Sequence, residues 1–173
     1  MGAKVKLNLN LPSSLWTAKD SARLAADTLA AIKLRTSKGI DANGTPFIDY
    51  STQPLYVSYR GARLKPKGGR VSRTGLSVYY KGGYKQYKIE SRRMGRGSSA
   101  LVDLVLSGTL MNNLVILHAD AQRFIIGLTQ HVRHYGYEVN DDREFLGLSQ
   151  RDVNMIVSAV QFNLARKIKG GRS

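Results

Sequence analysis

The sequence predicts an α+β domain in which an antiparallel sheet of three or four strands is flanked by an N-terminal and a C-terminal helix, with a basic extended excursion between them. Three observations support this fold class. Apolar residues recur at helical spacing near both ends, short alternating apolar runs occupy the second half, and the middle is cationic with few apolar residues. A length of 173 residues predicts a single domain. Its expected parts are a terminal arm or strand (1–12), a first helix and loop (13–50), a basic, tyrosine-rich excursion (51–100), and a sheet with the C-terminal helix (101–173).

The first twelve residues have the periodicity of a strand. Apolar and polar side chains alternate up to Pro12, which ends the run. We expect this arm to pair at a sheet edge, in its own subunit or in a neighbour. The alternating apolar residues are Val5, Leu7, Leu9 and Leu11.

The first long helix is predicted from a cap at Ser13 or Ser14 to about Ser37, with Gly39 as its stop. Its predicted apolar stripe consists of Ala18, Ala22, Ala25, Leu29 and Ile32.

The loop that follows carries turn residues, and Phe47 and Tyr50 are expected to anchor it to the core. The Asp41–Gly44 phrase resembles the start of a calcium loop, but Thr52 stands where a ligating Glu would be required, so we predict no calcium site.

The basic, tyrosine-rich part contains three short predicted elements. Residues 55–59 and 76–80 are expected to be extended, and residues 84–93 are expected to form a short helix. Residues 60–74 have almost no apolar side chains, so we expect them to be mobile or ordered only by a partner. Residues 94–100 are expected to be a flexible connector.

The core elements resume at Leu101. The sequence predicts a strand over 101–106, a helical turn near Leu110 and a β-hairpin of residues 115–118 and 123–128. Residues 129–142 are predicted to be a polar loop, packed by two tyrosines.

The last helix has the clearest signals. Ser149 is the predicted N-cap and Asp152 completes a capping box, while Gly170 follows the last cationic turn. Its apolar stripe predicts a helix that docks against a sheet or another helix. The stripe consists of Val153, Ile156, Val157, Val160, Leu164 and Ile168.

Charge is concentrated in one segment. The chain has a net charge of +15, with 27 Lys and Arg against 12 Asp and Glu. Residues 60–96 hold twelve of those cations and a single acid, Glu90, which gives +11 for that segment. This imbalance predicts a polyanionic neighbour: nucleic acid, an acidic protein surface or a ring of acidic subunits. The chain has no cysteines, no evident signal peptide and no apolar run of the length of a membrane span, so we expect a soluble protein without a membrane partner.

No catalytic constellation is predicted. The three histidines, His118, His131 and His134, lack a metal-binding framework. Ser107 precedes Gly108 but lacks the nucleophile-elbow pattern. The glycines of 95–100 come before a predicted strand, whereas a dinucleotide-binding turn follows one. We therefore predict a non-enzymatic protein with no cofactor and no metal.

Several phrases occur together in an order that resembles a known family. The clearest is Arg-Glu-Phe-Leu-Gly-Leu-Ser at 143–149, before the last helix, where Glu144 stands at a position that is often Pro in the family. The others are Gly-Ile-Asp-Ala-Asn-Gly-Thr-Pro-Phe at 39–47, Gly-Gly-Tyr-Lys-Gln-Tyr-Lys at 82–88, Leu-Val-Leu-Ser-Gly-Thr-Leu-Met at 104–111 and His-Tyr-Gly at 134–136. Over about residues 18–169, the chain resembles tailed-bacteriophage virion-morphogenesis proteins, the tail-completion or head–tail joining proteins of the neck.

The resemblance implies a structural virion protein that assembles in the host cytoplasm and forms a ring between head and tail. A homo-oligomeric ring, with a hexamer favoured, is expected to contact a connector or stopper and a tail terminator or tube, with possible transient contact with genomic DNA in the lumen. The expected partner contacts are Arg60, Arg63, Lys65, Lys67, Arg70, Arg73, Lys81, Lys85, Arg92, Arg93 and Arg96. The expected family-motif scaffold residues are Ser107, Gly108, Leu110, His134, Gly136, Arg143, Phe145, Leu146 and Gly147.

The alternative hypothesis is a nucleic-acid-binding module that uses the same basic segment, 60–96. Seven of the nine tyrosines fall in or beside it, and interleaved cations and aromatic rings suit single-stranded nucleic acid. These seven are Tyr50, Tyr56, Tyr59, Tyr79, Tyr80, Tyr84 and Tyr87.

Overall fold

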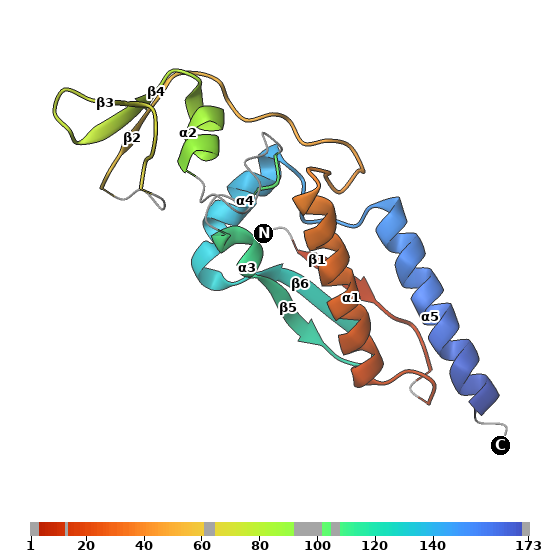
Figure 1. The fold of residues 1–173 in the computed structure, drawn as a ribbon. Coiled ribbons are helices and arrows are strands. Elements are labelled where there is room, and N and C mark those ends of the chain that lie inside the picture. Colours follow the sequence, from red (N-terminus) through yellow and green to blue (C-terminus); the bar gives the residue numbers. More distant parts are fainter. Residues whose placement is uncertain (1–3, 13, 61–64, 92–101, 105–107, 171–173) are drawn as a thin grey trace.

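The computed structural model describes residues 4–12, 14–60, 65–91, 102–104 and 108–170. The fold is α+β, with two three-stranded antiparallel sheets and long helices near both ends of the chain, which confirms the predicted class. The first helix lies across the larger sheet, and the last helix runs beside the first and projects past it (Figure 1). The smaller sheet forms a separate lobe at the opposite end.

The larger sheet has the strand order β1-β6-β5, and all its pairs are antiparallel. Strand β1 (Val5–Asn8) is an edge strand paired with β6 (Arg123–Leu128), so the predicted arm joins the sheet of its own subunit. Strand β5 (Leu114–Ala119) is joined to β6 by a tight turn, which confirms the predicted hairpin. The core lies between this sheet and the first helix, and it includes fully buried Trp16 and Phe124.

Helix α1 (Ala18–Ser37) starts later than predicted. Thr17, not Ser13 or Ser14, is the N-cap, and it forms a capping box with Asp20. The reason is the buried Trp16, whose indole N–H donates to Ser21 Oγ at 2.7 Å, while its backbone N–H closes a turn onto the Pro12 carbonyl. That turn uses the residues that would have formed a longer helix.

The buried face of α1 also differs from the predicted stripe. Ala25 and Ile32 are buried as expected, but Ala18 and Ala22 are exposed. Small polar residues take their places on the face against the sheet, because they allow close approach and bond within the helix or to nearby side chains. The buried residues are Ser21, Leu24, Ala25, Thr28, Ile32, Arg35 and Thr36. The helix ends before Gly39, whose φ of 76° is the left-handed conformation of a helix stop.

The prediction of a polar loop over 129–142 is wrong. A short 3-10 turn, η1 (Gln130–Val132), leads into helix α4 (Arg133–Asp142). The helix was hidden in the sequence because its buried positions include Gly136 and Asn140. Gly136 sits so close to Leu128 that an added Cβ would collide with that side chain, and Asn140 Oδ1 accepts a bond from the Leu146 N–H at 2.8 Å.

The strand predicted over 101–106 is not present in its described part, 102–104. Leu104 has a φ of 54°, which a strand does not allow. Its N–H donates to the Tyr50 hydroxyl at 3.2 Å, so the backbone bonds to a side chain where a strand would bond to a neighbouring strand. The following helical turn, α3 (Thr109–Asn112), agrees with the prediction.

Helix α5 (Gln150–Gly170) begins with the predicted capping box. The Ser149 N–H donates to Asp152 at 2.9 Å, and the Asp152 N–H donates to Ser149 Oγ at 3.2 Å. The helix is antiparallel to α1 and contacts one side of it.

The described part of 51–91 forms a small lobe, which we call the basic lobe. It contains β2 (Leu55–Ser58), β3 (Arg70–Val71), β4 (Ser77–Tyr80) and α2 (Gly83–Ser91), with the strand order β2-β4-β3. The predicted strands and helix are confirmed, and β3 adds an ordered strand within the stretch expected to be mobile. Val78, Tyr80 and Tyr87 form its own small core. The connector predicted at 94–100 lies outside the described residues.

Candidate interaction surfaces

The motif phrases come together where loop 41–50, α2 and the turn before α5 meet, which we call the motif junction. The Ala42 N–H donates to the Glu144 carbonyl at 2.6 Å. Gly147 packs against the same alanine, because a Cβ at Gly147 would lie 2.6 Å from the Ala42 Cβ. Two phrases that are about a hundred residues apart are therefore fitted to one another.

Arg35 at the end of α1 is the centre of the first cluster in the junction. Its buried guanidinium forms an ion pair with Asp152 and donates to the carbonyls of Phe145 at 2.8 Å and Gly147 at 3.1 Å. Burial lowers the pKa of Arg35, and the Asp152 charge opposes that shift. The arginine therefore holds the Phe-Leu-Gly turn and the first turn of α5 in place.

Lys88 on α2 is the centre of the second cluster. Its ammonium donates to the Tyr50 hydroxyl at 2.6 Å and to Asp103 at 2.5 Å, and it lies 4.2 Å from the Tyr50 ring centroid. Burial raises the pKa of Tyr50, and the Asp103 charge adds to the shift. Lys85 pairs with Asp49 at 2.5 Å. Two cations of the basic segment therefore tie the lobe to the rest of the molecule.

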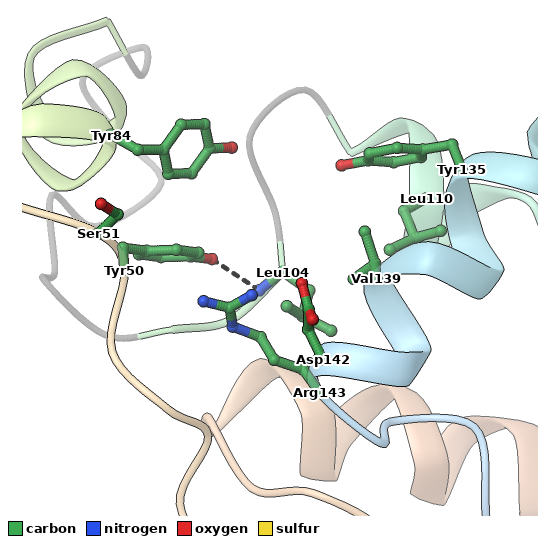
Figure 2. A pocket seen from close by; sticks show the side chains of 9 residues that line it. All are labelled: Tyr50, Ser51, Tyr84, Leu104, Leu110, Tyr135, Val139, Asp142 and Arg143. Carbon is green, nitrogen blue, oxygen red and sulfur yellow. Dashed lines mark hydrogen bonds between the residues drawn. The ribbon is translucent and has the colours of Figure 1, made fainter. Parts of the chain in front are cut away.

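A cavity of about 390 Å³ opens beside this cluster (Figure 2). Tyr84 and Tyr135 lie on opposite sides of its mouth, with Asp142 and Arg143 below. The Arg143 guanidinium donates to the carbonyls of Ile48 and Asp49 at 3.2 and 3.3 Å, and it lies 5.2 Å from the Tyr50 ring. These bonds are made to the loop, so Arg143 holds the loop against the turn before α5.

The predicted scaffold residues largely pack together. Gly108 takes a φ of 82° at the start of α3. The Leu110 side chain lies beside Gly136. Phe145 and Leu146 are buried. His134 is different: its side chain is 92% exposed, on the surface of α4. Ser107 lies outside the described residues.

Most of the predicted contact cations that the structure describes are at the surface, apart from Lys85. Arg63, Arg92, Arg93 and Arg96 lie outside the described residues. The exposed cations are Arg60, Lys65, Lys67, Arg70, Arg73 and Lys81.

The seven tyrosines of the basic segment divide into two groups. Four form a chain of ring contacts, with successive centroids 5.2, 5.9 and 5.4 Å apart, that joins the two hydrophobic cores. These are Tyr50, Tyr84, Tyr87 and Tyr80. Of the remaining three, Tyr56 and Tyr79 are cross-strand partners on the face opposite Tyr80. Tyr56 is 66% exposed and Tyr59, which follows β2, is 42% exposed. Sequence reasoning did not separate the groups, because cross-strand register decides which face each ring takes.

A second surface, missed by sequence reasoning, lies along α5. Of its apolar stripe only Ile156 is buried, while Val153, Val157 and Ile168 are exposed. An apolar groove of about 290 Å³ runs between this face and the arm that follows β1, and we call it the α5 groove. Its lining is Leu7, Asn8, Leu9, Asn10, Leu11, Val153, Ile156, Val157, Val160 and Gln161.

Other classes of site were searched in the described part of the chain. No group of three or more His, Asp or Glu side chains is placed to hold a metal ion there. None of the helices in that part has the length and apolar character needed to cross a membrane. Comparisons of the chain with family models, with curated proteins and with solved structures gave no match.

Proposed function

We propose that this protein is a ring-forming structural subunit of a tailed-phage neck, of the tail-completion or head–tail joining kind. The sequence phrases that resemble this family support the proposal, because they occupy positions that fix the fold. Ala42, Gly147 and the Phe145 carbonyl lie within one connected cluster around Arg35. A scaffold role accounts for these residues without a catalytic group.

The observation that carries the proposal is the uncovered apolar face of α5. The α5 groove has no charged side chain in its lining. A second copy of this chain, despite its net charge of +15, can therefore dock there without placing like charges in contact. The occupant is a neighbouring subunit, which contributes a different part of its surface, so that the contact repeats head to tail and closes into a ring.

The basic lobe lies at the far end of the molecule from the projecting end of α5 (Figure 1). This separation leaves its exposed cations free of the subunit contact. In the assembled neck they are available to a polyanionic neighbour, either an acidic surface of a connector, stopper, tail terminator or tube, or the DNA in the lumen. The resemblance favours six copies in the ring.

Native mass measurement together with negative-stain images tests the proposal. We expect discrete closed rings of one stoichiometry at micromolar concentration. A protein that remains a monomer at every concentration would show that the α5 groove is not a subunit contact.

A further inference from the structure

Three residues form a row across the outer face of the small sheet. Tyr56 on β2 is paired with Tyr79 on the central strand β4, and Tyr79 is paired with Arg70 on β3. Paired residues of antiparallel strands project to the same face, so all three lie side by side. The two rings are 4.8 Å apart between centroids and tilted by 43°. We call this the Tyr-Tyr-Arg row.

The row is not needed for the core of the lobe. The alternate positions, Leu55, Val57, Val78 and Tyr80, project to the opposite face, where Tyr87 of α2 covers Val78 and Tyr80. Tyr56 remains 66% exposed and Arg70 is exposed. The open ring of Tyr56 is on edge strand β2, and Tyr79 beside it on the central strand is partly exposed.

Exposed cations flank the strands that carry the row. Arg60 follows β2, Arg73 lies in the turn between β3 and β4, and Lys81 follows β4 at the other end. Lys65 and Lys67 lie on the described chain leading into β3. The acid of this segment, Glu90, is on α2 and accepts a hydrogen bond from Gln86, on the side away from the row.

Exposed rings beside exposed cations favour one of three kinds of polyanion as the ligand. An acidic protein would use the cations and gain little from stacked rings. Duplex DNA keeps its bases stacked inside and presents only phosphates to a flat sheet. A single strand offers both phosphates for the cations and unpaired bases for the rings and the guanidinium plane.

We propose that the Tyr-Tyr-Arg row is a stacking platform for single-stranded nucleic acid, with two adjacent bases on Tyr56 and Tyr79 and phosphates on the surrounding cations. This inference goes beyond ring assembly and does not rest on it, because the row and the α5 groove are separate surfaces. Binding is independent of sequence, since every base has a stacking face.

Fluorescence anisotropy with 5′-labelled oligo(dT) of 20 nucleotides tests the platform, with a 20-base-pair duplex and poly-L-glutamate as competitors, over a range of salt concentrations. The wild-type chain is expected to prefer the single strand to both competitors. Removing both rings in Tyr56→Ala/Tyr79→Ala should weaken single-strand binding by about 5- to 150-fold for each base that loses its stack. The slope of log affinity against log salt should stay unchanged, because no phosphate contact is lost.

Matched variants separate stacking from charge. Tyr56→Phe/Tyr79→Phe keeps both rings and should bind as the wild type does. Arg60→Ala removes one of the surrounding cations. It should lower the steepness of the salt dependence by about 0.7, the value for one phosphate on a single strand. Tyr135→Ala removes a tyrosine on α4, away from the row, and should have no effect. Circular dichroism checks folding. If the double alanine variant unfolds, Tyr56→Ala alone should weaken single-strand binding in the same way, by a smaller factor.

Three outcomes would overturn the proposal. The duplex or poly-L-glutamate could bind as tightly as the single strand, with no loss in the alanine variants. That result would show that the surface binds any polyanion and would favour an acidic protein as the partner. Single-strand binding that survives loss of both rings would show that stacking plays no part. If no single-strand binding is measured at about 0.1 M salt, single-stranded nucleic acid is not a ligand of this surface. Ring formation is measured separately, so each of these failures is distinct from failure of the neck proposal.

Discussion

The two long helices, α1 and α5, use their apolar residues in opposite ways. Helix α1 has seven buried residues, although small polar side chains such as Ser21 and Thr28 interrupt its buried face. Helix α5 has the more regular apolar stripe, yet only Asp152 and Ile156 are buried. A regular stripe therefore does not identify the helix that fills the core of the same chain.

The orientation of α5 is set by polar contacts at its two ends. Near its start, Asp152 pairs with Arg35 of α1, and near its end, Lys167 pairs with Asp20 of α1. These pairs turn Ile156 inward and leave Val153 and Val157 facing the α5 groove. The contrast between the helices suggests that α1 builds the subunit and α5 joins subunits.

The largest expected effect comes from breaking the buried end of this attachment. Arg35→Met should lower the free energy of unfolding by about 3–5 kcal/mol, because Asp152 would keep a buried charge without its partner. Urea unfolding at pH 7 measures the loss. Arg23→Met, at an exposed position on the same helix, is the matched control and should change stability little. A loss below about 1 kcal/mol would mean that α5 is held mainly by other contacts.

A smaller effect tests how α1 tolerates polar residues on its buried face. Both Thr28 and Thr36 are fully buried. The Thr28 hydroxyl donates to the Leu24 carbonyl at 2.7 Å, whereas the Thr36 hydroxyl has no hydrogen-bond partner among the described residues. Thr36→Val should therefore raise the free energy of unfolding by about 1 kcal/mol, and Thr28→Val should lower it by a similar amount. Thermal unfolding of the pair gives the two signs, and equal effects would contradict this assignment.

The smallest effect concerns the far end of the attachment. The hydrogen bond from Lys167 lowers the pKa of Asp20 to about 2, and the Thr17 cap adds to the shift. An acid whose pKa is lowered by folding stabilises the fold above its usual pKa of about 3.9 and loses that contribution as the pH falls towards 2. Asp20→Asn should remove this part of the pH dependence between pH 4 and 2. Urea unfolding across that range checks it, and an unchanged pH profile would contradict the pairing.

Much of the fold could be predicted from local signals in the sequence. Alternation identified β1 and the β5–β6 hairpin, and the Ser149–Asp152 spacing identified the cap of α5. Such signals depend only on near neighbours. Helix α4 was missed because its buried residues are Gly136, which packs against Leu128, and Asn140, which bonds to the Leu146 N–H. They replace the apolar residues that a periodic pattern needs.

The candidate surfaces were predicted less completely. Composition identifies a cationic segment but not which of its cations are engaged within the chain: Lys85 was predicted to have the same role as Arg70, although it pairs with Asp49. Which tyrosines face outward depends on the pairing of β2 with β4, and this is a tertiary property. The exposure of α5 depends on the ion pairs at its two ends, whose partners are more than a hundred residues apart in the chain.

The central claim, that the α5 groove joins subunits, is tested most directly by Val157→Asp, measured by sedimentation velocity beside the wild type. Val157 is 47% exposed in the single chain, so the change should leave the thermal midpoint nearly unchanged while a desolvated carboxylate disrupts the contact. Leu76→Asp, at a 61% exposed position in the basic lobe, is the control. We predict that the wild type and Leu76→Asp sediment as rings and that Val157→Asp sediments as a monomer. Rings formed by Val157→Asp as readily as by the wild type would contradict the claim.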